Sequence, residues 1–89
     1  MYGIYKVCYY SFLPIHDVMN VFKHLNLEGE PEYQFDNLES AINTLETHYK
    51  EIVTKEHCGK GTKYTLCGIV DSFGNVKAVL NLDKVICLA

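Results

Sequence analysis

Hydrophobic positions recur along the chain with two different periods, and their order predicts a mixed fold. From Asp36 to Val53, apolar residues return every three or four positions, which is the period of a helix with one buried face. Asp36 is placed to cap this helix, and Glu39 lies where a capping box is completed. We expect the core to bury the apolar stripe, which comprises Leu38, Ala41, Ile42, Leu45, Tyr49, Ile52 and Val53.

A shorter helix is predicted to begin at Pro14. Proline suits the first helical position because its missing N–H would have no partner there. Gly29 and Pro31 close the segment. Its apolar stripe has helical spacing and consists of Ile15, Val18, Met19, Phe22 and Leu25.

The remaining apolar segments are typical of strands. Tyr2–Tyr10 is rich in residues that suit a pleated sheet, with Tyr5, Val7 and Tyr9 on one face and apolar positions on the other, so we expect an interior strand. A turn is predicted at 72–75, where Gly74 permits a positive φ. The other predicted strands are Glu32–Phe35, which is short, Lys63–Asp71, Asn75–Leu82 with Val76, Ala78, Leu80 and Leu82 on one face, and Val85–Leu88.

These elements predict the order β-α-(β)-α-β-β-β within a single α+β domain of residues 1–89. We expect a two-layer arrangement, with two helices packed on one face of a mainly antiparallel sheet of four to five strands. Several strands are apolar on both faces. The uncovered sheet face would then favour a homo-oligomer, because large apolar patches usually mark interfaces.

Composition excludes some classes of protein. Apolar residues make up 48% of the chain and charged residues 21%, which argues against disorder. The net charge is −3 and all eight cations are Lys, so we expect no sequence-specific nucleic-acid partner. The first residues contain no long apolar run, and we expect no signal peptide and no membrane partner. We interpret the cysteines as reduced thiols of a cytoplasmic protein; they are Cys8, Cys58, Cys67 and Cys87.

The segment from His57 to Lys63 has the most distinctive composition. Two glycines would allow backbone N–H groups to converge on an anion, and nearby lysines would add charge. A P-loop, however, follows a strand and opens a helix, whereas here the predicted order is reversed. The simpler interpretation is a helix end at Gly59 followed by a connector. The candidate ligand-binding residues of this segment are Gly59, Lys60, Gly61, Thr62 and Lys63.

Tyrosines are concentrated in the first strand. Tyrosine anchors protein interfaces and also stacks on nucleobases. The alternative is that a hydrophobic strand uses tyrosine at half-buried positions. Tyr9 and Tyr10 are the two that we include among the candidate ligand-binding residues.

No catalytic or metal-binding motif emerges. His57, Cys58 and Cys67 are possible soft ligands, but the close Cys or His pairs of zinc sites are absent. His16-Asp17 fits the surface of a helix. No Cys lies in a context that would activate a nucleophile. We therefore expect no catalytic residue, no metal and no cofactor.

The leading hypothesis is a small non-enzymatic binding protein that inhibits or regulates a partner protein. The partner would be a host protein or a second copy of the chain, and the Arg-free composition fits an inhibitor encoded by a phage or mobile element. The first alternative is an oligomeric protein that sequesters a phosphorylated (cyclic) nucleotide, with phosphate on the His57–Lys63 loop and a tyrosine on the base. The second alternative is a small enzyme that depends on Cys or His.

Overall fold

Two helices pack on an antiparallel sheet, and the α+β class is confirmed. The elements follow the predicted order, except that one further strand, Lys55–Cys58, comes after the second helix, so the sheet of the described residues has six strands and not the four to five that we expected. The computed structural model describes residues 1–25, 27, 29–50, 55–81 and 84–87. Within these ranges no helix is long and apolar enough to cross a membrane. The elements are β1 (Tyr2–Ser11), α1 (Val18–His24), β2 (Tyr33–Phe35), α2 (Leu38–His48), β3 (Lys55–Cys58), β4 (Gly61–Asp71), β5 (Val76–Asn81) and β6 (Lys84–Cys87).

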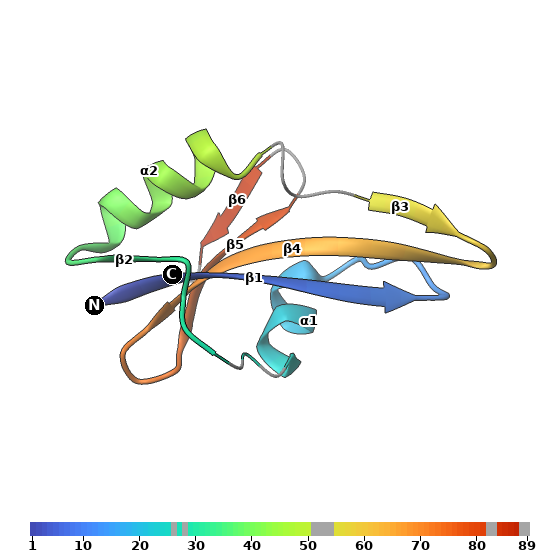
Figure 1. Ribbon diagram of the computed structural model, residues 1–89, viewed down its shortest axis with the longest axis horizontal. Coiled ribbons are helices and arrows are strands. Elements are labelled where there is room, and N and C mark those ends of the chain that lie inside the picture. Colours follow the sequence, from blue (N-terminus) through green and yellow to red (C-terminus); the bar gives the residue numbers. More distant parts are fainter. Residues whose placement is uncertain (26, 28, 51–54, 82–83, 88–89) are drawn as a thin grey trace.

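The sheet has six strands among the described residues, in the order β2-β1-β4-β5-β6, with β3 also paired to β4. β1 occupies one edge of β4 along its whole length, so β3 and β5 share the other edge. β5 pairs with the second half of β4, whereas β3 pairs with the first. The paired strands β1, β4 and β3 therefore extend beyond β5 and β6 as an arm, and the molecule measures 41 × 24 × 24 Å (Figure 1). We define the arm as Lys6–Ser11, Lys55–Cys58 and Gly61–Thr65.

The two helices lie on opposite faces of the sheet, whereas the sequence led us to expect both on one face (Figure 1). The reason is that β4 and β5 are buried on both faces, so each face needs its own apolar cover. The second apolar face that motivated self-association is thus covered by α1. The α2 side holds Ile4, Ala41, Leu45, Tyr49, Cys67, Ile69, Ala78 and Leu80; the α1 side holds Val18, Met19, Phe22, Tyr64, Leu66, Val70, Val76 and Val79.

The α2 helix is shorter than the predicted range Asp36–Val53. Asn37, not Asp36, is the N-cap: its backbone is extended and its Oδ1 accepts a 2.7 Å hydrogen bond from the Ser40 N–H. The helix ends at His48, Tyr49 is the C-cap, and residues 51–54 lie outside the described part. The predicted stripe buries Ala41, Leu45 and Tyr49.

The α1 helix begins later than predicted. Asp17 is its N-cap, with Oδ1 accepting a 3.0 Å hydrogen bond from the Asn20 N–H, so Pro14 precedes the helix. Phe22 is fully buried and lies directly over Gly68 of β4, where a Cβ would come within 2.7 Å of the Phe22 ring. The glycine therefore allows α1 to approach the sheet closely.

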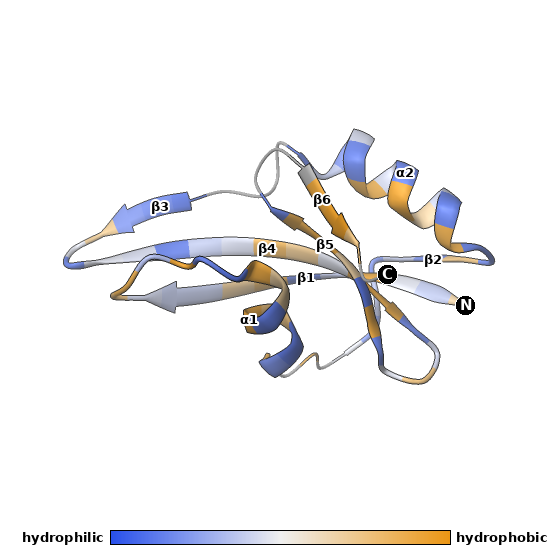
Figure 2. Ribbon diagram, turned by 180° about the vertical axis from the view of Figure 1, so that it is seen from behind, coloured by the Kyte–Doolittle hydropathy of each residue, from blue (hydrophilic) through white to orange (hydrophobic). Residues whose placement is uncertain are grey.

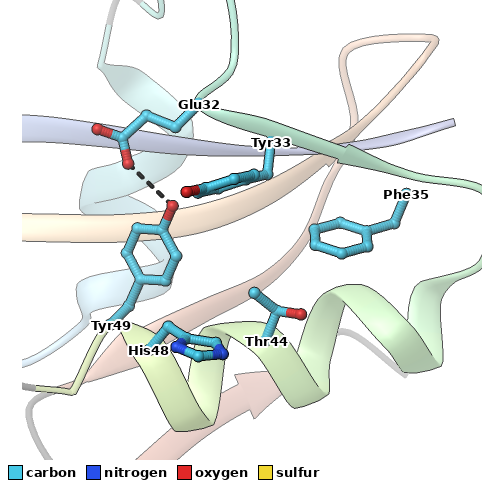
Figure 3. A pocket seen from close by; sticks show the side chains of 6 residues that line it. All are labelled: Glu32, Tyr33, Phe35, Thr44, His48 and Tyr49. Atoms are coloured by element: carbon cyan, nitrogen blue, oxygen red, sulfur yellow. Dashed lines mark hydrogen bonds between the residues drawn. The ribbon is translucent and has the colours of Figure 1, made fainter.

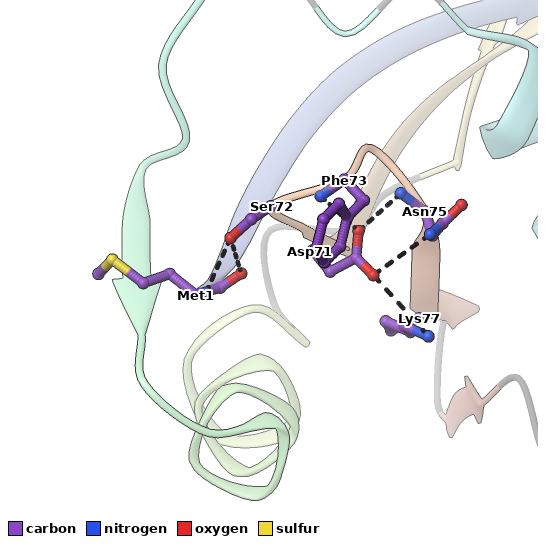
Figure 4. A network of polar contacts seen from close by, with 6 residues as sticks. All are labelled: Met1, Asp71, Ser72, Phe73, Asn75 and Lys77. Carbon is purple, nitrogen blue, oxygen red and sulfur yellow. Dashed lines mark hydrogen bonds and ion pairs between the residues drawn. The ribbon is translucent and has the colours of Figure 1, made fainter.

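The turn between β4 and β5 forms as predicted, with Gly74 at φ +84°. Asp71 Oδ1 accepts hydrogen bonds from the backbone N–H groups of Phe73 and Asn75, at 2.9 and 2.8 Å (Figure 4). A register shift between Ile69 and Val70 accompanies the turn.

The side-chain pattern of β5 differs from the prediction at Val76. Val76 packs on the α1 side, whereas Ala78 and Leu80 pack on the α2 side, because the register shift places an extra residue between them. Val79 is also fully buried on the α1 side, so β5 is apolar on both faces. Leu82, the last member of the predicted face, lies outside the described residues.

Candidate functional site

The segment singled out in the sequence is a β-hairpin, not the exit of a helix. Cys58 of β3 pairs with Gly61 of β4, which leaves Gly59 and Lys60 as a two-residue turn. Gly59 has φ +60°, as such hairpin turns require at their first central position. The prediction that Gly59 ends a helix is wrong, because His57 and Cys58 are already in β3.

Gly61 has a packing role. The Tyr10 ring lies over it, and a Cβ there would collide with the Tyr10 hydroxyl. From this position the hydroxyl of Tyr10 donates a 3.0 Å hydrogen bond to the carbonyl oxygen of Cys58, across β4. The hairpin turn thus explains the glycine at 59, and packing against Tyr10 explains the glycine at 61, without any ligand.

The predicted ligand-binding residues divide between the two faces of the arm. Alternation along β1 and β4 places Tyr10 and Lys63 on the α2 side, where they lie opposite each other in register. Tyr9 and Thr62 point to the α1 side. Lys63 also lies opposite Glu56 of β3, so an acidic residue is its cross-strand neighbour. The structure therefore does not gather the predicted set into one site.

A depression of about 260 Å³ lies at the end of the arm. Its polar lining includes Lys55, His57, Lys60 and Thr62, with Thr62 Oγ1 3.5 Å from His57 Nδ1. Two lysines, a histidine and a hydroxyl are groups that bind phosphate. Its apolar wall is formed by Phe12, Leu13 and Pro14.

The tip of the arm exposes large apolar side chains. Phe12 is 71% exposed and Leu13 is 74% exposed, while the Tyr10 ring meets Phe12 edge to face at 5.1 Å. The tip is held in shape by Ser11, whose Oγ accepts from the Leu13 N–H at 3.1 Å and donates to the Leu13 carbonyl at 2.7 Å. These apolar groups are thus fixed in an exposed arrangement.

The outer edge of β1 is open along most of its length. β2 pairs only with Tyr2, Gly3 and Ile4, and no other strand among the described residues pairs with that edge. The carbonyl of Ile4 points to this edge, because it accepts a 2.9 Å hydrogen bond from the Glu32 N–H. Backbone groups alternate in direction along a strand, so the N–H and C=O groups of Lys6, Cys8 and Tyr10 also face outwards.

A second hollow, which the sequence analysis missed, lies between β2 and α2 and has a volume of about 690 Å³ (Figure 3). Tyr33 and Phe35 project into it from β2, and Thr44 and His48 face it from α2. No local motif could have indicated it, because its lining comes from β2, from α2, and from Glu32 and Tyr49, which lie just before β2 and just after α2. The one signal in the sequence was Tyr33, a large aromatic residue in a short strand, and the structure shows that it is exposed.

Tyr49 forms the back wall of this hollow. It is 2% exposed, and its hydroxyl donates a 2.9 Å hydrogen bond to Glu32 Oε2. Burial, followed by the hydrogen bond to Glu32, raises the pKa of Tyr49 well above its usual range. The phenol is therefore neutral and serves as a donor at physiological pH.

The proposed soft metal ligands are not brought together. Cys58 lies opposite Gly61, six positions along β4 from Cys67, a separation of roughly 20 Å at about 3.3 Å per residue. Within the described ranges no three His, Cys, Asp or Glu side chains gather as a metal site would need. Cys67 is fully buried, and burial raises the pKa of its thiol to about 12.

Asp17 of the His16-Asp17 pair caps α1, which explains its position without any chemistry. All four cysteines are free thiols in the structure. Comparison of the chain with protein-family models, with curated proteins and with solved structures found no match. The function must therefore be argued from the geometry of the surfaces described above.

Proposed function

We propose that the protein is a non-enzymatic binding protein that acts by occupying a partner protein. The observation that carries this proposal is the open edge of β1, where three residues direct outwards backbone donors and acceptors that pair with no strand in the described part of the chain. An extended segment of a partner can add to such an edge as a further strand, with main-chain hydrogen bonds providing affinity. The partner then becomes the strand next to β1.

The neighbourhood of this edge supports the proposal. Proteins usually protect an open edge with charges, proline or a bulge, but the exposed stretch from Lys6 to Ser11 carries one charged residue and pairs with β4 without a bulge. The edge leads directly to the exposed Phe12 and Leu13. A partner segment running along β1 would therefore bury the apolar tip as well, adding hydrophobic stabilisation.

A second copy of the chain is the competing occupant. In the longest pairing of two β1 edges, centred on Cys8, Phe12 would lie opposite Ile4 of the other copy. That position is already taken by β2. Self-pairing would stop at Ser11 and leave the apolar tip exposed, whereas a separate partner can cover it. The Arg-free composition favours a host protein as that partner and a phage or mobile element as the source.

Cys8→Pro tests the edge directly. The Cys8 N–H points away from β4, so proline removes a donor from the open edge and leaves the β1–β4 hydrogen bonds in place. Cys8→Thr is the matched control, because it keeps the N–H and suits a strand. Both variants, with folding checked by circular dichroism, would be screened with a displayed library of short peptides and with host lysate.

We expect wild type and Cys8→Thr to retain the same peptides and the same host protein, and Cys8→Pro to lose both. Hydrogen exchange should show rapid exchange at Lys6, Cys8 and Tyr10 in the free protein and protection in the complex. Equal binding by folded Cys8→Pro would contradict the proposal. A concentration-dependent dimer that is lost in Cys8→Pro would instead identify a second copy as the occupant.

A second candidate function is favoured by the depression at the end of the arm. Lys55, His57, Lys60 and Thr62 line it together, and a phosphate group fits the charge of this set. Its volume of about 260 Å³ is at the lower end for a small-molecule site, so a phosphate would fill it and the rest of a nucleotide would lie outside. A protein that binds a nucleotide in this way, without converting it, would sequester it.

Thermal melting with cyclic and linear nucleotides tests this candidate. A ligand at 100 times its Kd should stabilise the protein by about 2.7 kcal/mol. Lys60→Ala should abolish the shift, whereas Lys63→Ala should retain it, because Lys63 points to the other face of the arm. The absence of a shift with every nucleotide would remove this candidate.

A further inference from the structure

The hollow between β2 and α2 has walls of unusual composition. Tyr33 and Phe35 stand over α2, where Thr44 and His48 form the floor (Figure 3). The Tyr33 and Tyr49 ring centroids are 6.4 Å apart with an interplanar angle of 84°, so two tyrosines form a right-angled corner. Tyr33 is 59% exposed and presents most of its ring to solvent.

One acidic side chain stands at this aromatic corner. Glu32 lines the hollow, and its side chain is 41% exposed. It already attracts an ammonium group, since Lys6 Nζ lies 3.7 Å from Glu32 Oε1 on the side away from Tyr49. Aromatic faces and a carboxylate both favour positive charge, because the face of a ring carries the negative end of its quadrupole.

The hydrogen bonds of this corner discriminate between kinds of cation. Glu32 Oε2 accepts from the Tyr49 hydroxyl and Lys6 Nζ lies 3.7 Å from Oε1, so part of the accepting capacity of the carboxylate is already in use. A primary ammonium held against the Tyr33 and Phe35 rings would lose hydration on the side of the rings, which offer no oxygen or nitrogen acceptor to replace water. A quaternary ammonium has no N–H to satisfy and needs only an aromatic face and a nearby negative charge.

We propose that this hollow binds a quaternary ammonium group, held against the Tyr33 ring and Phe35 by the charge of Glu32. The hollow of about 690 Å³ is within the usual range for small-molecule sites, so it accommodates the cationic head together with part of an attached chain. The site lies next to the open edge of β1, with which it shares the Lys6 side chain, but it uses none of the backbone groups of that edge and none of the residues that line the depression at the end of the arm. It therefore stands independently of the function proposed above.

Three probes with the same hydroxyethyl tail test the proposal. Choline carries the quaternary ammonium, ethanolamine the primary ammonium, and 3,3-dimethyl-1-butanol is the neutral isostere of choline. Binding would be followed by NMR shifts of Tyr33, Thr44 and His48. We expect choline to bind about tenfold more tightly than either of the others.

Variants separate the role of charge from that of shape. Glu32→Gln keeps an oxygen acceptor for Tyr49 and removes the negative charge. The affinity for choline should therefore fall about tenfold, while the affinity for the neutral alcohol should not change. The Tyr33→Phe variant should still bind choline and the Tyr33→Leu variant should not, because phenylalanine keeps an aromatic ring with a quadrupole and leucine does not. Lys6→Gln removes a competing cation and should tighten choline binding severalfold.

Phe73→Leu is the matched control, because Phe73 is 89% exposed, lies in the β4–β5 turn and is not among the residues that line the hollow. Urea unfolding of each variant separates loss of binding from loss of folding. Equal affinity for choline and the neutral alcohol would overturn the proposal, as would tighter binding of ethanolamine. The absence of choline shifts at any of the lining residues would do the same.

Discussion

The hydroxyl of Tyr49 donates a 2.9 Å hydrogen bond to Glu32 and so ties the end of α2 to the residue that precedes β2. Glu32 is also joined to β1, because its N–H bonds to the Ile4 carbonyl and its carboxylate faces Lys6. One contact thus connects the helix with two strands at the edge of the sheet. It also forms the back of the aromatic hollow.

Tyr49→Phe should destabilise the protein by about 1 kcal/mol, because it removes a hydrogen bond while keeping the buried ring. Urea unfolding monitored by circular dichroism measures the free energy of unfolding. Tyr33→Phe is the control and should change it by less than about 0.5 kcal/mol, since Tyr33 is 59% exposed. Equal effects of the two substitutions would show that the Tyr49 hydrogen bond adds nothing.

Gly68→Ala should destabilise the fold by about 1–3 kcal/mol, because its Cβ would come within 2.7 Å of the buried Phe22 ring. Phe22→Leu makes room at that point, at its own cost in buried area. The double variant should therefore be more stable than the sum of the two single effects predicts. Additive effects in a double-mutant cycle would mean that the two residues are not in close contact.

Asp71 should make the free energy of unfolding depend on pH in the acidic range. Hydrogen bonds from the backbone of Asn75 and then Phe73 hold the pKa of Asp71 below its usual range. Its contribution is fully present above the unfolded-state pKa of about 3.9 and is lost as the pH falls through the lower folded-state pKa. Asp71→Asn keeps an oxygen acceptor and does not titrate.

The test for Asp71 is urea unfolding of wild type and Asp71→Asn from about pH 6 to about pH 2. The free energy of unfolding of wild type should exceed that of Asp71→Asn by less and less as the pH falls. A constant difference between the two proteins across this range would contradict the assignment of the shifted pKa to Asp71.

Three of the four cysteines should react rapidly with a thiol reagent in the folded protein, and Cys67 should not. Cys67 is fully buried and its pKa is raised to about 12, so near pH 8 only about one molecule in ten thousand carries the thiolate. Ellman's reagent should report three fast groups and a fourth only after unfolding in urea. A Cys67→Ala variant should show three groups in both states, which identifies the protected thiol.

The sequence was a good guide to elements whose signal is local. The β4–β5 turn was predicted correctly because Gly74 adopts a positive φ that few other residues tolerate. The alternation in β1 placed Tyr5, Val7 and Tyr9 on one face, as the α1-side cluster confirms. The α2 stripe identified Ala41 and Leu45 as buried, and the helix differed from the prediction mainly at its ends.

Other features depend on contacts between distant segments, and a pattern in the sequence does not encode them. His57 and Cys58 carry no strong strand signal, and their strand exists because β4 offers a long edge that β5 leaves half unpaired. Tyr10 and Lys63 lie on one face of the sheet and Tyr9 and Thr62 on the other, which follows from the register of β1 and β4. The aromatic hollow depends on β2 lying beside α2.

By itself the sequence determined the class of the fold, the order of all its elements except β3, and part of its core, such as Ala41 and Leu45, because periodicity and turn chemistry act over a few residues. Only the tertiary structure decided that α1 and α2 cover opposite faces, that the edge of β1 beyond Ile4 stays open, and that Tyr49 reaches Glu32. These features arise from the order and register of strands, in which residues far apart in the chain satisfy one another's hydrogen bonds and apolar surface.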